Sequence, residues 1–140
     1  SETESDLLLK WRDFVQACDA DIITGYNTQN FDMPYLMDRA ATLKAKCKAL
    51  GRFPELGRMR NVLSKVKETS FSSAQYGNRD NKETIIEGRV MFDLLPYMFR
   101  NHKLSSYSLN SVSAEFLGQQ KEDVHHSIIS DLQNGSDADR

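Results

Sequence analysis

The chain has 140 residues, of which 39% are hydrophobic and 27% are charged, and its formal net charge at pH 7 is −2. These values fit a single domain, or a piece of a larger one, with enough apolar residues to build a core. They give no global case for a nucleic-acid partner, and no apolar run approaches the length that crosses a membrane.

The N-terminal part of the sequence predicts a helix, a strand and a second helix. An amphipathic helix is expected over residues 5–19, where apolar side chains recur at helical spacing: Leu7, Trp11, Phe14, Val15 and Cys18. The segment "DIITGY" (residues 21–26) predicts a short buried strand that ends at Gly25. The second helix is expected to begin at Asp32, two residues before a proline that suits a first turn, and to end near Leu50.

The remaining sequence predicts a loop, three strand segments and two helices. Residues 51–65 are expected to form a loop with at most one helical turn. Alternation on both sides of "GNRDN" (residues 77–81) predicts a long β-hairpin with its turn there, and "EGRVMFDLL" (residues 87–95) predicts a further strand. Helices are expected over residues 108–117 and 123–135. The first has Ser108 as its N-cap and is expected to turn inward Leu109, Val112, Phe116 and Leu117. This order of elements is that of part of an α/β layered domain.

A polar segment, "YNTQN" (residues 26–30), follows the first predicted strand and leads toward Asp32. A polar loop between a strand and a helix lies at the carboxyl edge of a sheet, where open α/β folds bind ligands. Asp32 then has two interpretations. It is either an N-cap or first-turn acid stabilised by free N–H groups, or a ligand of a divalent cation such as Mg²⁺. The residues alone favour the capping interpretation, because capping acids far outnumber catalytic ones.

Few other residues suit a catalytic or metal site. Asp93 is the only other acid in an apolar setting, and we interpret it as a structural carboxylate that accepts hydrogen bonds from the backbone. His125 and His126 are adjacent and point to different faces of a helix, and Cys18 and Cys47 lack ligand spacing, so a zinc site is rejected. The cysteines are expected to be reduced thiols, buried or half-buried.

Basic residues gather in one stretch of the chain. Residues 39–67 contain nine Lys or Arg and a single acid, Glu55. A basic stretch between acidic ends fits a polyanion, but a solvated basic helix and loop explains it as well. On charge alone, the solvated surface is the preferred interpretation.

Four stretches, in order, resemble the exonuclease domain of family B DNA polymerases. "NTQNFDMPYL" matches that family's second exonuclease motif, Asn-x-x-x-Phe-Asp, and is followed at compatible spacing by "EGRVMFDLLPY", "KLSSYSLNSVSAEFLG" and "QKEDVHHSIISDLQNG". The resemblance covers the chain from about Asp19 to Gly135. It implies an α/β fold of the RNase H-like type, in which helices flank a mixed sheet and a β-hairpin is inserted. It also implies 3′→5′ removal of mismatched nucleotides with two Mg²⁺ or Mn²⁺ ions.

The resemblance implies roles for residues of the second motif. Asp32 takes the place of the catalytic, metal-binding acid. Asn27 and Phe31 match positions that contact the single-stranded 3′ end of the DNA primer. The chemistry is plausible, because a Phe ring stacks on bases and an amide binds sugar or phosphate without reading sequence.

Residues further along the chain are implied to touch the same DNA strand. Ser108 and Leu109 match the family's (Ser/Thr)-Leu-x-x-hydrophobic motif. Lys121 partly matches a Lys that steadies the scissile phosphate, although His126 stands where that motif usually has Ala. All three are therefore expected to be DNA-binding residues.

Two motifs of the family are expected outside the chain. No Asp-x-Glu motif precedes the first strand, and the chain ends at Arg140, ahead of the place of the Tyr-x-x-x-Asp motif. Residues 1–140 are therefore expected to form a partial exonuclease domain. Because one carboxylate cannot fix two divalent ions, the fragment alone is expected neither to hold the ions nor to cut DNA. An unpaired edge of its strands predicts self-association.

The resemblance further implies a parent enzyme in the nucleus, a replicative DNA-directed polymerase. Its expected partners are the primer 3′ end and, through parts outside this chain, other holoenzyme subunits and the sliding clamp; no membrane is expected. Two alternatives stay open: a non-catalytic nucleic-acid or protein-interaction module that uses residues 39–67, and a degenerate RNase H-like domain kept for its structure. The intact second motif argues against degeneration, and steep salt dependence of binding is the mark of the purely electrostatic module.

Overall fold

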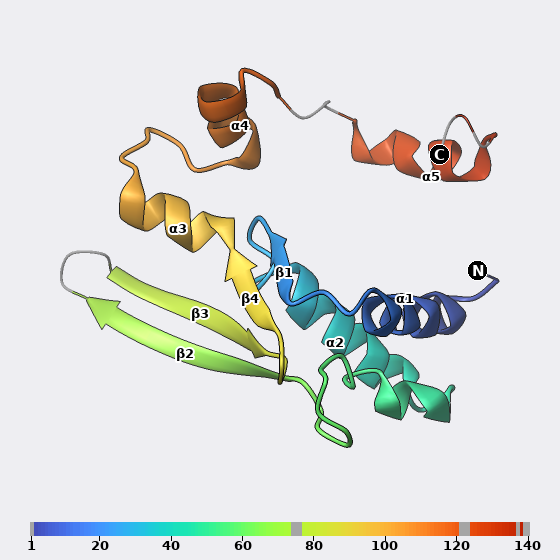
Figure 1. The fold of residues 1–140 in the computed structure, drawn as a ribbon. Helices are drawn as coiled ribbons and strands as arrows, with labels where there is room; N and C mark the ends of the chain where they lie inside the picture. Colours follow the sequence, from blue (N-terminus) through green and yellow to red (C-terminus); the bar gives the residue numbers. More distant parts are fainter. Residues whose placement is uncertain (1, 74–76, 121–123, 137, 139–140) are drawn as a thin grey trace. The chain divides into compact units, whose positions relative to one another are not determined.

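The computed structural model describes residues 2–73, 77–120, 124–136 and 138 (Figure 1). The chain divides into two compact units, residues 1–101 and residues 102–140. Within the described residues, no helix is long and apolar enough to cross a membrane.

The first unit begins with helix α1, Glu4–Cys18, which confirms the predicted amphipathic helix. The Thr3 hydroxyl caps it by accepting a hydrogen bond from the Asp6 backbone N–H at 3.1 Å. The buried face differs from the prediction, because Leu8 is buried whereas Leu7 and Phe14 are exposed. Trp11 and Val15 of the predicted stripe pack against the core, so the prediction is confirmed for these two residues.

Two short parallel strands form the small sheet of this unit. Strand β1, Ile22–Gly25, pairs with β4, Val90–Asp93, in a register that sets Gly25 beside Asp93. Both strands lie where they were predicted, but β1 is not buried as predicted, because Ile22 is 57% exposed. Because the strands are parallel, the loop that follows β1 and the residues that follow β4 start from the same edge (Figure 1).

Helix α2, Asp32–Leu43, begins where predicted but ends seven residues earlier than Leu50. A separate 3₁₀ helix, η1, covers Lys48–Arg52. A continuous helix would carry Leu50 about 15 Å along the axis from Ala40. The two residues instead share one core cluster, so the chain has to turn back between them.

A second sheet consists of two long antiparallel strands, β2 (Lys65–Ser73) and β3 (Gly77–Ile85). The turn predicted at residues 77–81 is wrong, because these residues belong to β3. Residues 74–76, which separate the strands, lie outside the described part of the chain. Ile86, directly after β3, is buried in the core and fixes where that strand ends.

The core of the first unit consists of two clusters. One joins α1, α2 and η1 through Leu8, Ala40, Leu50 and Phe53, with the Trp11 ring stacked on Phe53 at a centroid distance of 5.8 Å. The other joins the start of α2 to the small sheet through buried Met33, Leu56 and Ile86, with Ile23 and Met91 packed against them. The second cluster therefore fixes the first turn of α2 relative to β1 and β4.

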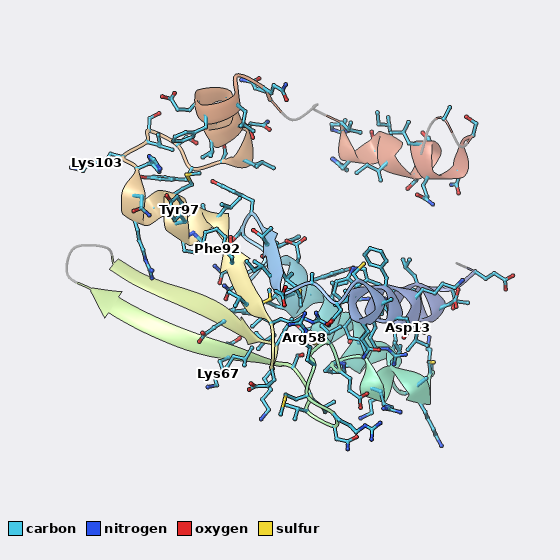
Figure 2. All side chains as sticks on the ribbon, viewed as in Figure 1. Asp13, Arg58, Lys67, Phe92, Tyr97 and Lys103 are labelled. Carbon is cyan, nitrogen blue, oxygen red and sulfur yellow. The ribbon has the colours of Figure 1, made fainter. Side chains whose placement is uncertain are left out.

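A cluster of ion pairs lies at the end of the small sheet that is opposite to Gly25. Arg58, which Figure 2 labels, pairs with Asp19 at 2.7 Å and with Asp21 at 2.6 Å, and Arg89 also reaches Asp19 at 3.0 Å. The hydrogen bond from Arg58 holds the pKa of the Asp19 carboxyl below its usual value. These contacts tie the loop after η1 to the entrance of β1.

Helix α3, Leu94–Asn101, follows β4 without a break. The Tyr97 ring lies 6.1 Å from that of Phe92, its neighbour at the end of β4 (Figure 2). Both Phe92 and Val90 are exposed on the sheet. The strand thus turns Met91 and Asp93, and not Val90 and Phe92, toward the interior.

The second unit contains α4, Leu109–Leu117, then η2, His126–Ile128, and α5, Ile129–Asn134. Ser108 caps α4 as predicted, and Val112 is buried. The other residues expected to face inward are exposed: Leu109, Phe116 and Leu117. The last helix is shorter than predicted, because its regular α-helical part begins only at Ile129.

Candidate functional site

The loop at residues 26–31 carries two of the predicted site residues and leads directly into the third. Asp32 is the first residue of α2 and is exposed. It does not cap the helix, because Phe31 occupies the N-cap position and makes no side-chain capping hydrogen bond. Among the described residues, no hydrogen bond or ion pair of the Asp32 carboxylate occurs. The group is therefore a first-turn acid that is free to bind a ligand.

The buried carboxylate of Asp93 holds the start of this loop. Its Oδ1 accepts hydrogen bonds from the backbone N–H groups of Asn27 at 2.7 Å and Leu95 at 3.0 Å, and its Oδ2 accepts one from Gln29 at 3.0 Å. The interpretation of Asp93 as a structural carboxylate bonded to the backbone is confirmed. Its negative charge also contributes, after burial, to raising the pKa of the Tyr26 phenol.

Side chains of the loop fix its other contacts. The Asn30 side-chain oxygen accepts a hydrogen bond from the Lys82 backbone N–H on β3 at 2.7 Å. Thr28 packs so closely on Gly25 that a Cβ at residue 25 would lie 2.3 Å from the Thr28 methyl carbon. The loop is thus tied to β1, to the end of β4 and to β3.

The two loop residues that are predicted to contact DNA, Asn27 and Phe31, differ in backbone conformation and exposure. Asn27 has a φ of 62°, a left-handed conformation that Asn tolerates better than most residues, and its carbonyl accepts the Phe31 N–H at 3.1 Å. The Phe31 side chain is 67% exposed. An exposed ring next to an unpaired carboxylate presents both a stacking face and a metal ligand.

The other predicted DNA contacts lie in or near the second unit. The Ser108 hydroxyl accepts the Ser111 backbone N–H at 3.2 Å, so it acts as a helix cap. Leu109 is 43% exposed and thus accessible to a partner. Lys121 lies outside the described residues. The structure therefore brings Asn27, Phe31 and Asp32 together on one loop and helix start.

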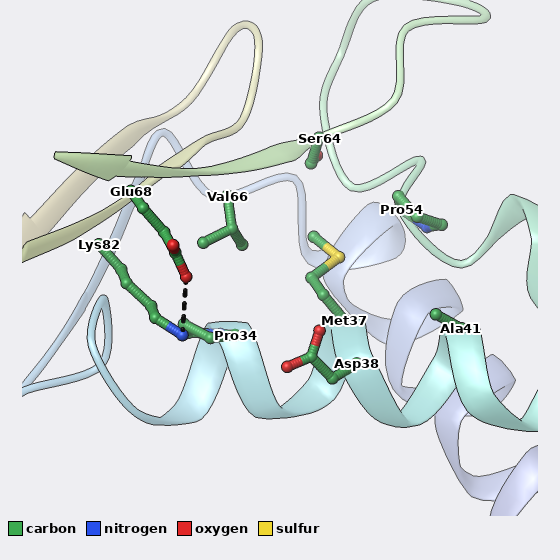
Figure 3. A pocket seen from close by; sticks show the side chains of 9 residues that line it. All are labelled: Pro34, Met37, Asp38, Ala41, Pro54, Ser64, Val66, Glu68 and Lys82. Atoms are coloured by element: carbon green, nitrogen blue, oxygen red, sulfur yellow. Dashed lines mark ion pairs between the residues drawn. The ribbon is translucent and has the colours of Figure 1, made fainter.

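A groove of about 620 Å³ lies between α2 and the long strand pair (Figure 3). Its lining includes an ion pair between Glu68 and Lys82 at 3.4 Å, and Asp38 on α2. The buried Ser64 hydroxyl at its edge has no hydrogen-bond partner. None of the predicted site residues lines this groove, so it is separate from the loop at residues 26–31.

The basic stretch is partly neutralised by acids. Arg39 forms an ion pair with Glu4, Arg52 with Glu55, and Arg58 with the acids already described. The paired Arg39 and Arg52 hold the pKa values of the Glu4 and Glu55 carboxyls below their usual range. These pairs favour a structural interpretation of part of the stretch over a polyanion surface.

Neither cysteine belongs to a cluster of possible metal ligands within the described residues. Cys18 and Cys47 are both free thiols, and Cys18 is exposed rather than buried or half-buried as predicted. Within the part of the chain that the structure describes, no group of three or more His, Cys, Asp or Glu side chains is arranged to hold a metal ion. Asp32 alone supplies one carboxylate, whereas two divalent ions need several. Among the described residues, the donor set by itself does not fit a pair of ions.

Comparison with known proteins settles the family. Residues 1–112 match the model of the family described as DNA polymerase family B, exonuclease domain. The chain belongs to this family. The resemblance to family B polymerases that the second exonuclease motif indicated is thereby confirmed.

The family B relatives are similar over nearly the whole chain. It is 62% identical over 135 residues to the DNA polymerase delta catalytic subunit of Glycine max. It is 60% and 54% identical over 139 residues to the subunits of the same name from Oryza sativa subsp. japonica and Mesocricetus auratus. These alignments cover 96%, 99% and 99% of this chain, respectively, and 12% of each relative. The chain thus spans about an eighth of the length of these family B polymerases.

The sequence did not connect Asp93 and Asn30 to the loop at residues 26–31. The backbone contacts of Asp93 join residues 64 and 66 positions apart, and that of Asn30 joins residues 52 apart. No local spacing encodes such partners. The one available signal was an acid at the end of an apolar strand, which has to find hydrogen-bond donors when it is buried.

Proposed function

We propose that the chain is part of the proofreading exonuclease of a replicative family B DNA polymerase of the delta type. The reaction is hydrolysis of the 3′-terminal phosphodiester of mismatched DNA. The observation that carries the proposal is the exposed, unpaired carboxylate of Asp32, directly after an anchored loop at the carboxyl end of β1. Membership of the exonuclease-domain family supports it.

The proposed fold of the complete domain is RNase H-like. The small parallel sheet of β1 and β4 then belongs to its central sheet, and the long pair β2 and β3 is its inserted hairpin. Residues 1–140 are a part of that domain without its first and third exonuclease motifs.

The proposed roles of the residues follow from their chemistry. Asp32 supplies one carboxylate to a site of two Mg²⁺ or Mn²⁺ ions, and the remaining ligands come from outside this chain. The chemistry that such ions would supply is activation of the attacking water and charge stabilisation of the leaving 3′ oxygen. Phe31 stacks on a base of the single strand, and Asn27 binds its sugar or phosphate. Ser108, Leu109 and Lys121 contact the same strand.

The isolated chain is proposed to be inactive, because one carboxylate does not fix two ions. The parent enzyme is proposed to act in the nucleus with the other holoenzyme subunits and the sliding clamp. Binding of DNA by phosphate contacts and stacking carries no sequence preference.

The proposal is tested in the full-length subunit that contains this segment. Asp32→Ala is expected to slow Mg²⁺-dependent trimming of a labelled single-stranded oligonucleotide by at least about 100-fold, since a direct metal ligand and its charge are lost. Asp38→Ala removes another exposed acid of α2 and serves as the matched control, with trimming close to wild type. Primer extension by all three proteins reports that they are folded. A wild-type subunit that does not trim, or an Asp32→Ala variant that trims normally, contradicts the proposal.

A further inference from the structure

Asp93 is a buried acid whose hydrogen bonds are directed mainly to the proposed site. The residue is 6% exposed, and two of its three backbone donors, Asn27 and Gln29, belong to the loop at residues 26–31. The third donor, Leu95, lies in the first turn of α3. Among the described residues Asp93 has no ion pair, so the N–H groups are what stabilise its charge.

We infer that Asp93 is a positioning residue for excision: it fixes the loop backbone and, through it, the placement of Asn27 and Asp32 toward the DNA 3′ end. The inference rests on the proposed exonuclease function and adds to it a residue outside the motif of Asp32. Asp93 acts through the loop and does not itself touch the reacting atoms.

The geometry requires a carboxylate at this position. The parallel register sets Asp93 beside Gly25, so its side chain reaches Asn27, two residues after the strand ends. Both oxygens of a carboxylate accept hydrogen bonds, and here both are used by loop N–H groups. An Asn side chain has one accepting oxygen and an NH₂ group, which would face a backbone N–H of the loop. Replacement by Asn therefore preserves shape but breaks one of the two loop contacts.

The loop depends on this anchor for its entry into α2. The helix begins without a side-chain cap, since Phe31 at the N-cap position makes no such bond. Its first turns are joined to the loop by hydrogen bonds from Met33 to Thr28 at 2.9 Å and from Tyr35 to Phe31 at 3.1 Å. A shift of the loop is thereby transmitted to Asp32, which lies between these bonds. Misplacement of a catalytic group by 1 Å costs on the order of 100-fold in rate.

The test uses the full-length subunit and compares Asp93→Asn with Asp19→Asn. Asp19 makes ion pairs at the other end of the small sheet, just before β1, so its substitution weakens the sheet without touching the loop. Single-turnover excision at saturating oligonucleotide is expected to fall on the order of 100-fold in Asp93→Asn and to stay within about threefold of wild type in Asp19→Asn. Hydrogen exchange followed by mass spectrometry is expected to become faster in peptides covering residues 26–31 of Asp93→Asn only.

The outcomes separate the inference from the function on which it rests. Normal excision by Asp93→Asn while Asp32→Ala is inactive overturns the inference and leaves the proposed function intact. If the wild type itself does not excise, the proposed function fails, and unchanged exchange of the loop in Asp93→Asn then overturns the positioning role as well. If Asp93→Asn loses primer extension because it misfolds, the variant Asp93→Glu provides the test of the positioning role. It keeps both acceptor oxygens and is expected to recover at least about tenfold more excision than Asp93→Asn; equal loss in both variants refutes positioning by the carboxylate.

Discussion

Gly25 lies where β1 gives way to the site loop, and its missing side chain leaves room for Thr28. A Cβ added there would lie 2.3 Å from the Thr28 methyl carbon, about 1.1 Å short of the 3.4 Å at which ordinary contact begins. Gly25 does not have a positive φ, so alanine is excluded by the contact and not by the backbone. Gly25→Ala therefore forces either the loop or the Thr28 side chain to move.

The expected cost follows from this overlap. Overpacking of this kind destabilises proteins by about 1–3 kcal/mol. Rotation of Thr28 about χ1 is an expensive escape, because a β-branched side chain has few favourable rotamers. We expect Gly25→Ala to lower the free energy of unfolding by about 2 kcal/mol, which moves the urea midpoint by roughly 1 M.

Urea unfolding followed by the fluorescence of Trp11, the single tryptophan of the chain, measures this change. The matched rescue is Thr28→Ser, which removes the methyl carbon of the overlap and keeps the hydroxyl. In a double-mutant cycle the two substitutions are expected to couple by at least about 1 kcal/mol, with the double variant more stable than Gly25→Ala alone. A cost of Gly25→Ala below about 0.5 kcal/mol, or additive effects of the two substitutions, refutes the reasoning.

Three further predictions concern the first unit. Phe53→Ala removes a ring with no exposed surface that stacks on Trp11, and is expected to cost about 3–5 kcal/mol in urea unfolding; a cost near 1 kcal/mol would mean that the core collapses around the gap. Because the pKa of Asp19 is lowered in the folded protein, its ion pairs stabilise the fold above the ordinary value of 3.8, and this stability is lost as the pH falls through the lowered pKa. The difference in urea midpoint between wild type and Asp19→Asn is therefore expected to shrink between about pH 6 and about pH 3. A constant difference would contradict this prediction. Within the described residues, β1 and β4 pair only with each other, so the isolated chain is expected to self-associate as its concentration rises; a monodisperse monomer in light scattering at high concentration would count against this.

Much of the first unit could be predicted from local patterns. Periodic apolar residues indicated α1 and α2, and a β-branched pair followed by glycine indicated β1. The local patterns gave wrong predictions where long-range packing determines the structure. Helix α2 ends at Leu43 because Leu50 has to return to the core, and "GNRDN" continues a strand although its residues favour turns.

The candidate site shows the same division. The position of Asp32 at the start of a helix after a polar loop was evident from residue order. Its exposure and lack of partners were not, because they depend on Phe31 taking the N-cap position. The direction of the Asp93 side chain depends on which residue of β1 it faces, and a sequence does not display strand register.

The pairing of β1 with β4 also has a consequence for synthesis of the chain. Gly25 and Asp93 are neighbours in space but are separated by both long strands and most of the core in sequence. A ribosome that has released residues 1–92 has released the loop but not the carboxylate that holds it. Contacts of such long sequence separation form late and slowly, after the entropy of closing the intervening chain has been overcome. The loop that presents Asp32 is therefore among the last parts of this unit to acquire its shape.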